Sequence, residues 1–479
     1  MTDRKQDRQF PGDLADYKEF VMQGLISADE MRRVDCNARA LGISGLELME
    51  SAGTGLSMVA RQYQIDRILI LCGGGNNGGD GMVAARHLSG EADITVLWHD
   101  SGRQTDATKT QLSRLAGCIV HTIPFRCRDD LINNSHLFQE TDLIIDALLG
   151  TGVTGNAREP LKTCIELANN SPAPVLSADL PSPGIHPDKV CAFHRAKTEG
   201  AITCGIGIPL LAEIGTGPGD LLTLKERDPS SHKGAGGNVL VIGGGPYQGA
   251  PYLAGLAALR AGADIVRVIS PCCLPEPDLI HVPVKGDKIT SEDLEIIIPL
   301  CEQSDVVLCG PGLGSGSHEV IREISPHIRK GVFDADALRN PLPVAGMSLY
   351  TPHAGEFERI TGKSPGNTPA ERARAIKTSG IQGTVLLKGR VDVISDRAGV
   401  RFNMTGTPAM TTGGTGDVLA GVCAALMVVA PAFDAACMGA WATGRAGEIV
   451  TGSQGYGMTA MDLLLAVPQV LFGRTHEGE

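Results

Sequence analysis

Short apolar segments that end abruptly in glycine recur along the chain, and they constrain its fold more than any other feature. Glycine supplies 61 of the 479 residues and is concentrated in bursts at 73–81, 150–155, 310–316 and 413–416. Each burst follows a predicted strand. Continuous apolar strands that alternate with helices are typical of a parallel sheet covered on both faces, so the pattern predicts an α/β fold. Glycine also lets the backbone approach a ligand closely.

The composition excludes several classes of protein. Hydrophobic residues make up 42% of the chain and charged residues 20%, which is too apolar for a disordered protein. The formal net charge of −12 argues against a nucleic-acid partner, because such binding needs an excess of Lys and Arg. The 13 cysteines include no CxxC pair, so we expect reduced thiols, no zinc site and a cytoplasmic location. No run approaches the roughly 18 apolar residues of a membrane helix.

A polar stretch near the middle of the chain, KERDPSSHKGAGG at 225–237, interrupts the alternation of strands and helices. Polar segments that contain Pro and Gly are typical of domain boundaries. We therefore predict two α/β domains, at residues 1–226 and 227–479. Apolar residues at helical spacing predict one helix from residue 26 to about 60. Helices exposed on two-sided sheets favour association into a homo-oligomer.

The sharpest candidate site of the second domain is the run Gly413-Gly414-Thr415-Gly416-Asp417, which leads into an apolar helix. Backbone N–H groups of such a turn, with the positive end of the helix, bind phosphate. A carboxylate at that place would repel the phosphate. We therefore interpret Asp417 as a base that takes a proton from a hydroxyl attacking the phosphate. A purely helix-capping role for Asp417 is the alternative.

This run and five other ordered segments resemble the ADP-dependent NAD(P)H-hydrate dehydratases, a family with the ribokinase-like fold. The other segments are HKGAGGNVLVIGG at 232–244, GAPYLAGLAALRAGA at 249–263, GPGLG at 310–314, TPHAGEF at 351–357 and LKGR at 387–390. The family uses ADP and Mg²⁺ to phosphorylate the ring hydroxyl of hydrated NADH or NADPH. Elimination of phosphate then restores NAD(P)H, and AMP is released. The resemblance implies this fold and this activity for the second domain.

The same resemblance implies roles for individual residues. Asp417 matches the base and would also contact the substrate. The residues expected to contact the nucleotide are Lys388, Gly389, Arg390, Val391, Asp392, Gly414, Thr415 and Gly416. Those expected to contact the hydrated dinucleotide are Ala250, Gly312, Gly314 and His353. Simpler interpretations stay open: His353 closes a turn, the glycines permit unusual backbone angles, and Ala250 is a small residue for helix packing.

Three loops of the first domain carry polar side chains directly after predicted strands. GGGNNGGDG at 73–81 has neither the lysine of a P-loop nor the glycine spacing of a dinucleotide-binding fold. Asp146 precedes the loop GTGVTGN at 150–156, and Asp179 to Ser182 follow the next strand. Two carboxylates, a hydroxyl and asparagine carbonyl oxygens favour proton transfer beside a bound monovalent cation.

These loops, with SADEM at 27–31 and LMESAG at 48–53, resemble the NAD(P)H-hydrate epimerase domain, which is fused ahead of the dehydratase in bacteria. The resemblance implies a Rossmann-like three-layer domain that interconverts the R and S hydrates. Asp179 would be the acid–base residue, and Asn77, Asp146 and Ser182 would bind K⁺. The residues expected to contact the hydrated dinucleotide are Asn76, Asn77, Gly78, Gly79, Asp80, Gly150, Thr151, Gly152, Val153, Thr154, Gly155, Asn156 and Asp179.

Two departures from the epimerase pattern distinguish this chain. Pro183 follows Ser182 where the family has glycine, and Ile208 or a neighbour stands where the family places a lysine. They leave open a first domain that binds its ligand without catalysis. For the whole chain, the alternative is an ATP-dependent ribokinase-like kinase for a small molecule, preceded by such a non-catalytic binding module.

Overall fold

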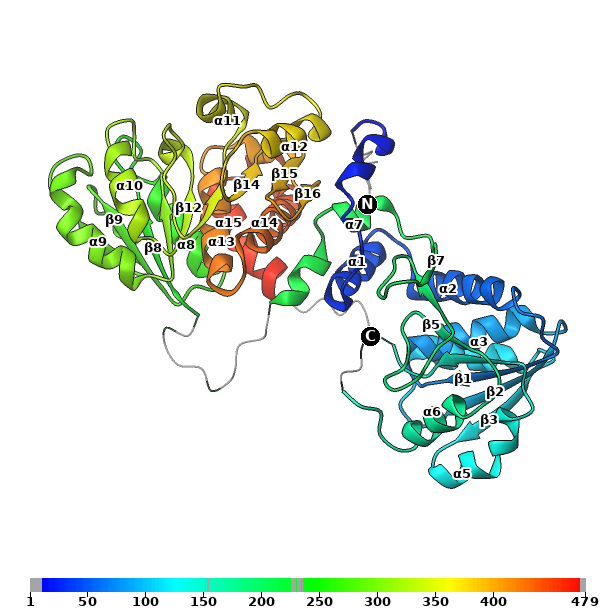
Figure 1. Ribbon diagram of the computed structural model, residues 1–479. Helices are drawn as coiled ribbons and strands as arrows, with labels where there is room; N and C mark the ends of the chain where they lie inside the picture. The colour runs from blue at the N-terminus through cyan, green and yellow to red at the C-terminus, as the bar shows by residue number, and fades with distance from the viewer. Residues whose placement is uncertain are drawn as a thin grey trace. The chain divides into compact units, whose positions relative to one another are not determined.

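The computed structural model describes residues 11–150, 152, 155–224, 230, 234 and 236–473, which form two compact α/β units (Figure 1). The N-terminal unit comprises residues 23–212. The C-terminal unit comprises the chain from residue 213 onward, joined by residues 11–22. The prediction of two α/β domains is therefore confirmed. The predicted boundary after residue 226 falls within 225–229, outside the described residues, and stays a prediction.

A seven-stranded parallel sheet forms the centre of the N-terminal unit, in the order β3-β2-β1-β4-β5-β6-β7. Because the chain builds outward in both directions from β1 and β4, their carboxyl ends form the point where such sheets bind ligands. The strands are β1 (Arg67–Cys72), β2 (Asp93–His99), β3 (His121–Phe125), β4 (Leu143–Ala147), β5 (Val175–Ala178), β6 (Lys189–Phe193) and β7 (Ile202–Cys204).

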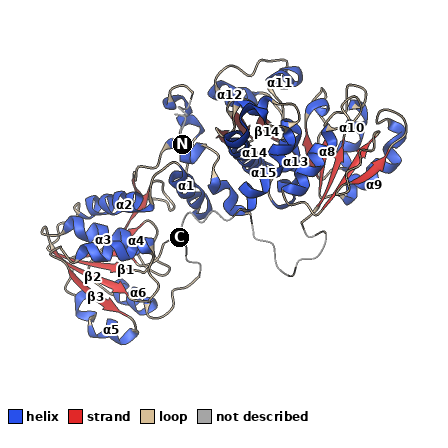
Figure 2. Ribbon diagram, turned by 180° about the vertical axis from the view of Figure 1, so that it is seen from behind, coloured by secondary structure: helices blue, strands red, loops and turns tan. Residues whose placement is uncertain are grey.

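Helices cover both faces of this sheet, which gives the expected three layers (Figures 1 and 2). Each face has its own apolar core. One face carries α1 (Ala28–Ala40), α2 (Gly45–Ala60), α3 (Asn76–Leu88) and α4 (Asp106–Leu115), and the other carries α5 (Arg128–Asn133), η2 (Ser135–Phe138) and α6 (Leu161–Asn169).

The single helix predicted from residue 26 to about 60 is wrong, because the structure has two helices there. The chain turns between α1 and α2, where Gly42 adopts a φ of +96°. The second helix begins with its own cap: Ser44 Oγ accepts the Glu47 N–H, and the Glu47 carboxylate accepts the Ser44 N–H. Apolar spacing alone did not reveal this interruption, because both helices bury residues in the same core.

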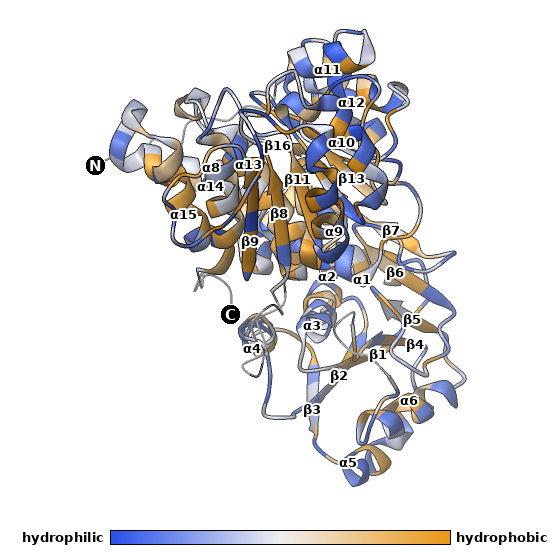
Figure 3. Cartoon of the chain, turned by 90° about the vertical axis from the view of Figure 1, so that its left-hand side faces the viewer, coloured by the Kyte–Doolittle hydropathy of each residue, from blue (hydrophilic) through white to orange (hydrophobic). Residues whose placement is uncertain are grey.

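A nine-stranded sheet forms the centre of the C-terminal unit, in the order β10-β9-β8-β11-β12-β13-β14-β15-β16. It is parallel up to β14, and β15 and β16 are antiparallel because their connections are too short for a crossover. The strands are apolar along most of their length (Figure 3). They are β8 (Asn238–Ile242), β9 (Ile265–Ser270), β10 (Ile280–Pro283), β11 (Val306–Cys309), β12 (Lys330–Phe333), β13 (Met347–Tyr350), β14 (Thr384–Leu387), β15 (Asp392–Ser395) and β16 (Val400–Asn403).

The main core of the C-terminal unit lies between this sheet and the helices α8 (Ala250–Arg260), α13 (Thr415–Val429), α14 (Ala432–Gln454) and α15 (Ala460–Phe472). On the opposite face lie α9 (Leu294–Gln303) and α10 (His318–Ile324) (Figures 1 and 2). No helix in the described part of the chain is long and apolar enough to cross a membrane. The remaining elements are α7 (Leu210–Ile214), α11 (Ala354–Thr361), α12 (Pro369–Thr378), η1 (Leu14–Phe20), η3 (Pro218–Thr223), η4 (Ser291–Asp293), η5 (Ser325–His327), η6 (Ala335–Ala337), η7 (Pro408–Thr411) and η8 (Gly455–Gly457).

The segment η1 packs on the C-terminal unit although it precedes the N-terminal unit in sequence. The rings of Tyr17 and Phe20 lie 5.2 and 5.5 Å from the ring of Phe402 in β16, in edge-on arrangements. The Arg374 guanidinium of α12 donates to the Glu19 carboxylate at 2.6 Å. Both aromatic rings are buried, so this segment completes the apolar core beside the edge of the second sheet.

We expect Phe20→Ala to lower the free energy of unfolding of the C-terminal unit by about 3 kcal/mol, because it removes a buried aromatic ring. The chain has two tryptophans, Trp98 in the N-terminal unit and Trp441 in the C-terminal unit. In a Trp98→Phe background, urea unfolding followed by fluorescence therefore reports the C-terminal unit alone. Leu14→Ala is the matched control, since Leu14 is exposed. Equal stability of the two variants would contradict the packing described here.

Candidate active sites

The predicted polar residues of the N-terminal unit gather beyond the carboxyl ends of β1, β4 and β5, which are neighbouring strands. The loop after β1 lies against the first turn of α3 so closely that a Cβ at Gly78 would lie 1.9 Å from the Gly73 carbonyl oxygen. Only glycine fits there. Asn76 is held from the side, because its Oδ1 accepts the Thr105 hydroxyl at 3.0 Å. The same loop therefore positions both Asn76 and the buried Asn77.

The three residues predicted to bind K⁺ belong to one buried hydrogen-bond network. The Ser182 hydroxyl donates to Asp146 Oδ1 at 2.6 Å and accepts the Leu149 N–H at 3.0 Å. The Asn77 amide nitrogen donates to the Leu149 carbonyl at 3.1 Å. Asn77 Oδ1 is buried and has no hydrogen-bond partner among the residues that the structure describes. Because a buried carbonyl oxygen is costly to leave unpaired, this atom fits the coordination of a cation.

Asp146 is fully buried at the end of β4. Burial raises the pKa of its carboxyl group, although hydrogen bonds from Ser182, Ser177 and the Leu148 N–H oppose the shift. Two of these donors come from the neighbouring strand β5 and its loop, with the Ser177 hydroxyl 2.8 Å from Asp146 Oδ2. A bound cation would supply the positive charge that this buried carboxyl group lacks.

Asp179 lies directly after β5 and makes an ion pair with a lysine. Its φ of +63° is in the left-handed region, which a residue other than glycine adopts only when its surroundings enforce it. Lys197 Nζ donates to Asp179 Oδ1 at 2.6 Å, and the Phe193 N–H donates to the same oxygen at 3.1 Å. The Asp179 N–H donates to the Cys191 carbonyl at 2.8 Å. The backbone and the lysine together fix this carboxylate.

Two further carboxyl groups lie in the electrostatic field of this ion pair. Burial raises the pKa of Asp80 well above its ordinary value, and the charges of Asp179 and Asp35 add to the shift. Burial also raises the pKa of Asp35 to about 6, while Arg39 and Lys197 oppose the shift. Carboxyl groups whose environments push their pKa values apart are typical of acid–base sites.

Lys197 is a charged residue of this site that the sequence did not single out. It reaches the catalytic candidate Asp179 from the loop after β6, and its position after a strand was the available signal. With Pro183 next in the chain, Ser182 still reaches Asp146. The expectation that the family's lysine is missing near Ile208 stays a prediction.

The second loop predicted to contact the dinucleotide is more open. Gly150 is half-buried, and a Cβ there would lie 3.4 Å from the Asn77 Cβ. Gly152, Gly155 and Asn156 are exposed. Gly79 lies in the first turn of α3, next to Asp80. Thr151, Val153 and Thr154 of the same prediction lie outside the described residues.

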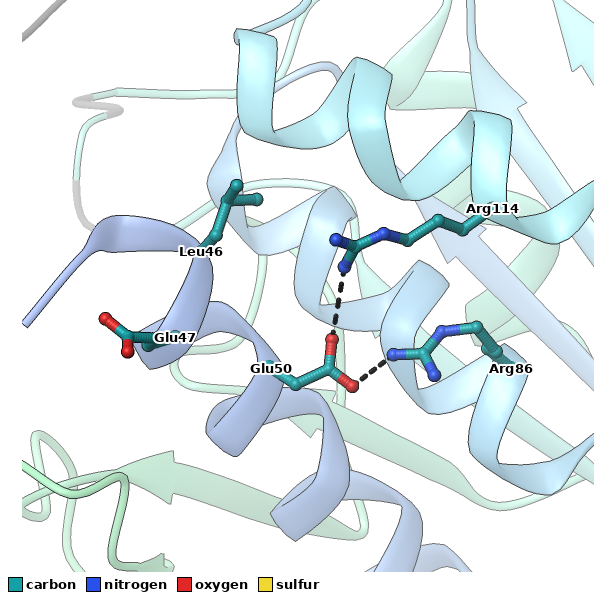
Figure 4. A pocket seen from close by; sticks show the side chains of 5 residues that line it. All are labelled: Leu46, Glu47, Glu50, Arg86 and Arg114. Atoms are coloured by element: carbon teal, nitrogen blue, oxygen red, sulfur yellow. Dashed lines mark hydrogen bonds and ion pairs between the residues drawn. The ribbon is translucent and has the colours of Figure 1, made fainter.

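A pocket between α2, α3 and α4 lies apart from these loops and is lined by Leu46, Glu47, Glu50, Arg86 and Arg114 (Figure 4). Glu50 accepts hydrogen bonds from Arg86 and His87, and Arg114 lies 3.5 Å from its other oxygen. The charges in this pocket are therefore largely paired with one another. Glu50, the glutamate of the LMESAG segment, thus links three helices. It lies apart from Asp179 and from the residues expected to bind K⁺.

In the C-terminal unit, the candidate residues follow five neighbouring strands. Gly312 lies after β11, Asp334 after β12, His353 after β13 and Lys388 after β14, while the segment after β8 leads to Ala250 at the start of α8. Adjacent parallel strands place their carboxyl ends at one edge of the sheet. The sheet therefore brings together residues that the sequence separates widely.

The glycine turn Gly413–Gly416 begins α13, with Gly414 as the N-cap residue. Among the described residues no side chain caps this end of the helix. The Thr415 N–H lies 3.5 Å from the Thr412 carbonyl, and a helix start without a side-chain cap is suited to an anion. The Thr415 hydroxyl is not directed at such an anion, because it donates to the Met410 carbonyl at 2.7 Å. A Cβ at Gly416 would lie 3.5 Å from Lys388 Nζ. The turn and the lysine therefore border the same space.

Asp417 is half-buried in the first turn of α13. Burial, and then the negative charge of Asp334, raise its pKa to about 7, while Lys388 offsets part of the shift. A carboxylate with a pKa near neutrality is a stronger base than an exposed aspartate and is still deprotonated in half of the molecules at that pH. The site therefore suits proton abstraction by Asp417.

Lys388 is held by an acidic residue that the sequence did not single out. Lys388 Nζ donates to Asp334 Oδ1 at 2.8 Å, and the Thr351 hydroxyl donates to the same oxygen at 2.8 Å. Burial lowers the pKa of Lys388, but the charges of Asp334 and Glu356 outweigh burial and raise it. Lys388 is therefore a fixed positive charge beside the glycine turn.

The rest of the predicted nucleotide segment forms the turn from β14 to β15. The Gly389 N–H donates to Asp392 Oδ1 at 2.9 Å, and Asn403 Nδ2 donates to Asp392 Oδ2 at 2.9 Å. Val391 is buried, and Arg390 is exposed. Asp392 thus stabilises the turn, whereas the Gly389 backbone and Arg390 lie at its surface.

His353 caps α11 and adjoins Lys388. Its Nδ1 accepts the N–H groups of Gly355 and Glu356 at 3.1 and 3.2 Å, while the Glu356 carboxylate accepts the His353 N–H at 2.8 Å. The Lys388 N–H donates to the carbonyl of Pro352 at 2.8 Å. The turn-closing interpretation therefore holds for the Nδ1 atom of His353. The ring is otherwise exposed, and its Nε2 lies 3.5 Å from the Glu356 carboxylate.

Ala250, Gly312 and Gly314 belong to two neighbouring segments, the start of α8 and the loop after β11. Gly312 adopts a φ of +68°, and a Cβ there would lie 2.1 Å from the Tyr247 carbonyl oxygen and 3.2 Å from the Ala250 Cβ. The Gly314 N–H donates to Asp336 Oδ2 at 2.8 Å. The glycines allow this loop to lie against the start of α8. The simpler interpretations therefore also apply: the glycines permit unusual backbone angles, and Ala250 is a small residue at a close contact.

Comparison with known proteins identifies the family of each unit. The family described as NAD(P)H-hydrate dehydratase matches residues 239–469, and the family described as YjeF-related protein N-terminus matches residues 45–205. A protein of Methanospirillum hungatei, named bifunctional NAD(P)H-hydrate repair enzyme, is 74% identical over 479 residues and covers 100% of each chain. This chain belongs to the family of bifunctional NAD(P)H-hydrate repair enzymes. The resemblance seen in the sequence is therefore confirmed.

More distant repair enzymes match over nearly the same length. Those of Pyrobaculum aerophilum and Escherichia coli are 39% and 32% identical and cover 93% of this chain. Among solved structures, the ADP/ATP-dependent NAD(P)H-hydrate dehydratase of Bacillus subtilis, co-crystallized with ATP and Mg²⁺, is 26% identical. It covers 54% of this chain and 97% of its own, with a TM-score of 0.46.

We expect Lys197→Met to raise the pKa of Asp35 above its value of about 6, because Lys197 is one of the positive charges that lower it. Carboxyl ¹³C chemical shifts of labelled aspartate, followed against pH, measure the change. Lys162→Met is the control, since Lys162 is exposed on α6. A pKa of Asp35 that stays at the wild-type value or falls would contradict the electrostatic coupling of this site.

Proposed function

We propose that the chain repairs hydrated NADH and NADPH with two activities. The C-terminal unit dehydrates the S hydrate in an ADP-dependent reaction, and the N-terminal unit interconverts the R and S hydrates. The observation that carries the proposal is Asp417, a carboxylate with a pKa of about 7 beside a glycine turn suited to phosphate. Full-length membership of the repair-enzyme family favours this function over a small-molecule kinase with a non-catalytic N-terminal module.

In the proposed dehydration, phosphorylation turns a poor leaving group into a good one. Asp417 accepts the proton of the ring hydroxyl while the hydroxyl oxygen attacks the β-phosphorus of ADP, and AMP departs. The N–H groups of Gly414, Thr415 and Gly416 and the Lys388 ammonium stabilise the charge on the transferring group. The C–O bond to the phosphate then breaks, and loss of a proton from the neighbouring ring carbon restores NAD(P)H.

The surrounding loops are proposed to bind the two substrates. The turn from Lys388 to Asp392 and the glycine turn border the nucleotide, while Ala250, Gly312, Gly314 and His353 border the hydrated dinucleotide. In the described part of the chain no group of three His, Cys, Asp or Glu side chains could hold a metal ion. Mg²⁺ is therefore proposed to enter with the nucleotide phosphates, where it neutralises charge on their oxygens.

In the proposed epimerisation, Asp179 transfers the proton, and Lys197 holds its carboxylate in place through the ion pair at 2.6 Å. The loops at Asn76–Asp80 and 150–156 are proposed to bind the hydrated dinucleotide. K⁺ is proposed to bind Asn77, Asp146 and Ser182, because Asn77 Oδ1 is a buried oxygen with no partner and Asp146 is a buried carboxyl group. A bound K⁺ would orient these loops. A homo-oligomeric state and a cytoplasmic location are further predictions from the sequence.

We expect the wild-type protein with ADP, Mg²⁺ and S-NADH hydrate to regenerate the near-ultraviolet absorbance of NADH. Because Asp417 must be deprotonated, kcat/KM should fall about tenfold per pH unit below about pH 7. Asp417→Asn should lower kcat by about 10²- to 10⁴-fold while nucleotide binding, measured by calorimetry, persists. The absence of NADH recovery with both ADP and ATP would refute the dehydratase proposal.

We expect the wild-type protein to recover NADH from the pure R hydrate as well, faster than the R hydrate is converted without protein. Asp179→Asn should abolish this gain and leave recovery from the pure S hydrate unchanged, because the change lies in the other unit. The S hydrate thus serves as an internal control in the same preparation. Recovery from R that is insensitive to Asp179→Asn would exclude Asp179 as the acid–base residue.

A further inference from the structure

At the proposed phosphoryl-transfer site, the Lys388 ammonium interacts electrostatically with two carboxylates, Asp334 and Asp417. Lys388 Nζ borders the glycine turn and acts electrostatically on both Asp334 and Asp417. It makes its hydrogen bond to Asp334, at 2.8 Å. If the ammonium were paired with Asp417 instead, the opposite charge would favour the ionised carboxylate and make it a weaker base.

We propose that Asp334 is a positioning residue of the dehydratase site, which holds the Lys388 ammonium beside the glycine turn and keeps it from pairing with Asp417. The inference rests on the proposed function, because it gives Lys388 and Asp417 the roles described above. Asp334 acts on the reaction only through these two residues.

The structure anchors Asp334 from several sides. Its side chain is 3% exposed, and Oδ1 accepts the Thr351 hydroxyl at 2.8 Å in addition to Lys388. Its N–H donates to the Cys309 carbonyl at 3.0 Å, and its own carbonyl accepts the Ala337 N–H. Three neighbouring strand ends, those of β12, β13 and β14, therefore meet at this carboxylate. Such an anchor fixes the ammonium to within a narrow volume.

The backbone next to Asp334 supports a function beyond packing. Ala335 adopts a φ of +47°, a conformation that costs energy for a residue with a Cβ and persists where the surroundings enforce it. The turn also sets Asp336, whose carboxylate accepts the Gly314 N–H at 2.8 Å. One short turn thus reaches both the nucleotide side and the dinucleotide side of the proposed site.

Two charged groups act on the pKa of Asp417 in opposite directions: Asp334 raises it and Lys388 lowers it. Glu356 also acts on Lys388, and Lys388 acts on Asp392. Removing the charge of Asp334 takes away the negative charge that raises the pKa of Asp417 and frees Lys388 to approach Asp417. Both consequences lower the pKa of Asp417.

The test compares Asp334→Asn with the wild-type protein in the ADP-dependent assay with S-NADH hydrate. In Asp334→Asn, the acid limb of the pH profile of kcat/KM should move to lower pH. KM for ADP should rise, and kcat should fall by about 100-fold, as when one stabilising donor, here the Lys388 ammonium, is displaced. Asp334→Glu restores the charge and should return the acid limb toward the wild-type pH. Asp287→Asn makes the same change of charge at an exposed position and should behave as wild type.

A second variant and a direct titration keep the test decisive. Thr351→Val removes one hydrogen bond to Asp334 without changing any charge, and it should shift the acid limb in the same direction by less. If Asp334→Asn turns over too slowly for a profile, ¹³C titration of the Asp417 carboxyl group measures its pKa directly. A lowered melting temperature with an unmoved acid limb and an unmoved Asp417 pKa would show a purely structural ion pair and overturn the inference. Failure of the wild-type assay would instead refute the proposed function.

Discussion

Both candidate sites depend on the geometry of parallel strands, which place their carboxyl ends at one edge of a sheet. In the N-terminal unit, β1, β4 and β5 bring the asparagine loop, Asp146 and Asp179 together at this edge. In the C-terminal unit, β12, β13 and β14 do the same for Asp334, Thr351 and Lys388. The helices contribute through their amino ends, where unpaired N–H groups face the same edge. Candidate site residues that are far apart in sequence thus become neighbours without long loops.

The two units also share an electrostatic arrangement. Each pairs a lysine with one carboxylate, Lys197 with Asp179 and Lys388 with Asp334, and each leaves a second carboxyl group nearby with a raised pKa. Burial is the main cause of the raised pKa in both cases. A lysine that is occupied by one partner cannot neutralise the other fully. Low polarity and a divided positive charge together raise the pKa of both carboxyl groups, Asp80 and Asp417.

The sequence predicted features that depend on neighbours along the chain. The glycine turn with Asp417, the loop at Asn76 and Asn77 and the fold class all follow from local spacing. The sequence did not predict which residues pair across neighbouring strands. Asp334 and Lys388 are separated by 54 positions, and the sequence singled out Lys388 without its partner. Lys197 was missed for the same reason, because its partner is fixed by the neighbouring strand ends and not by a motif.

The docking of η1 on β16 has a consequence for how the chain is made. Phe20 leaves the ribosome roughly 380 residues before Phe402, which at about 5–20 residues per second is a delay on the order of 20–80 s. During that time the N-terminal unit can fold, while Tyr17 and Phe20 of η1 cannot yet pack against Phe402. Completion of the second core therefore joins two segments that are synthesised roughly 380 residues apart. A gene divided between the two units would separate Phe20 from the core that buries it.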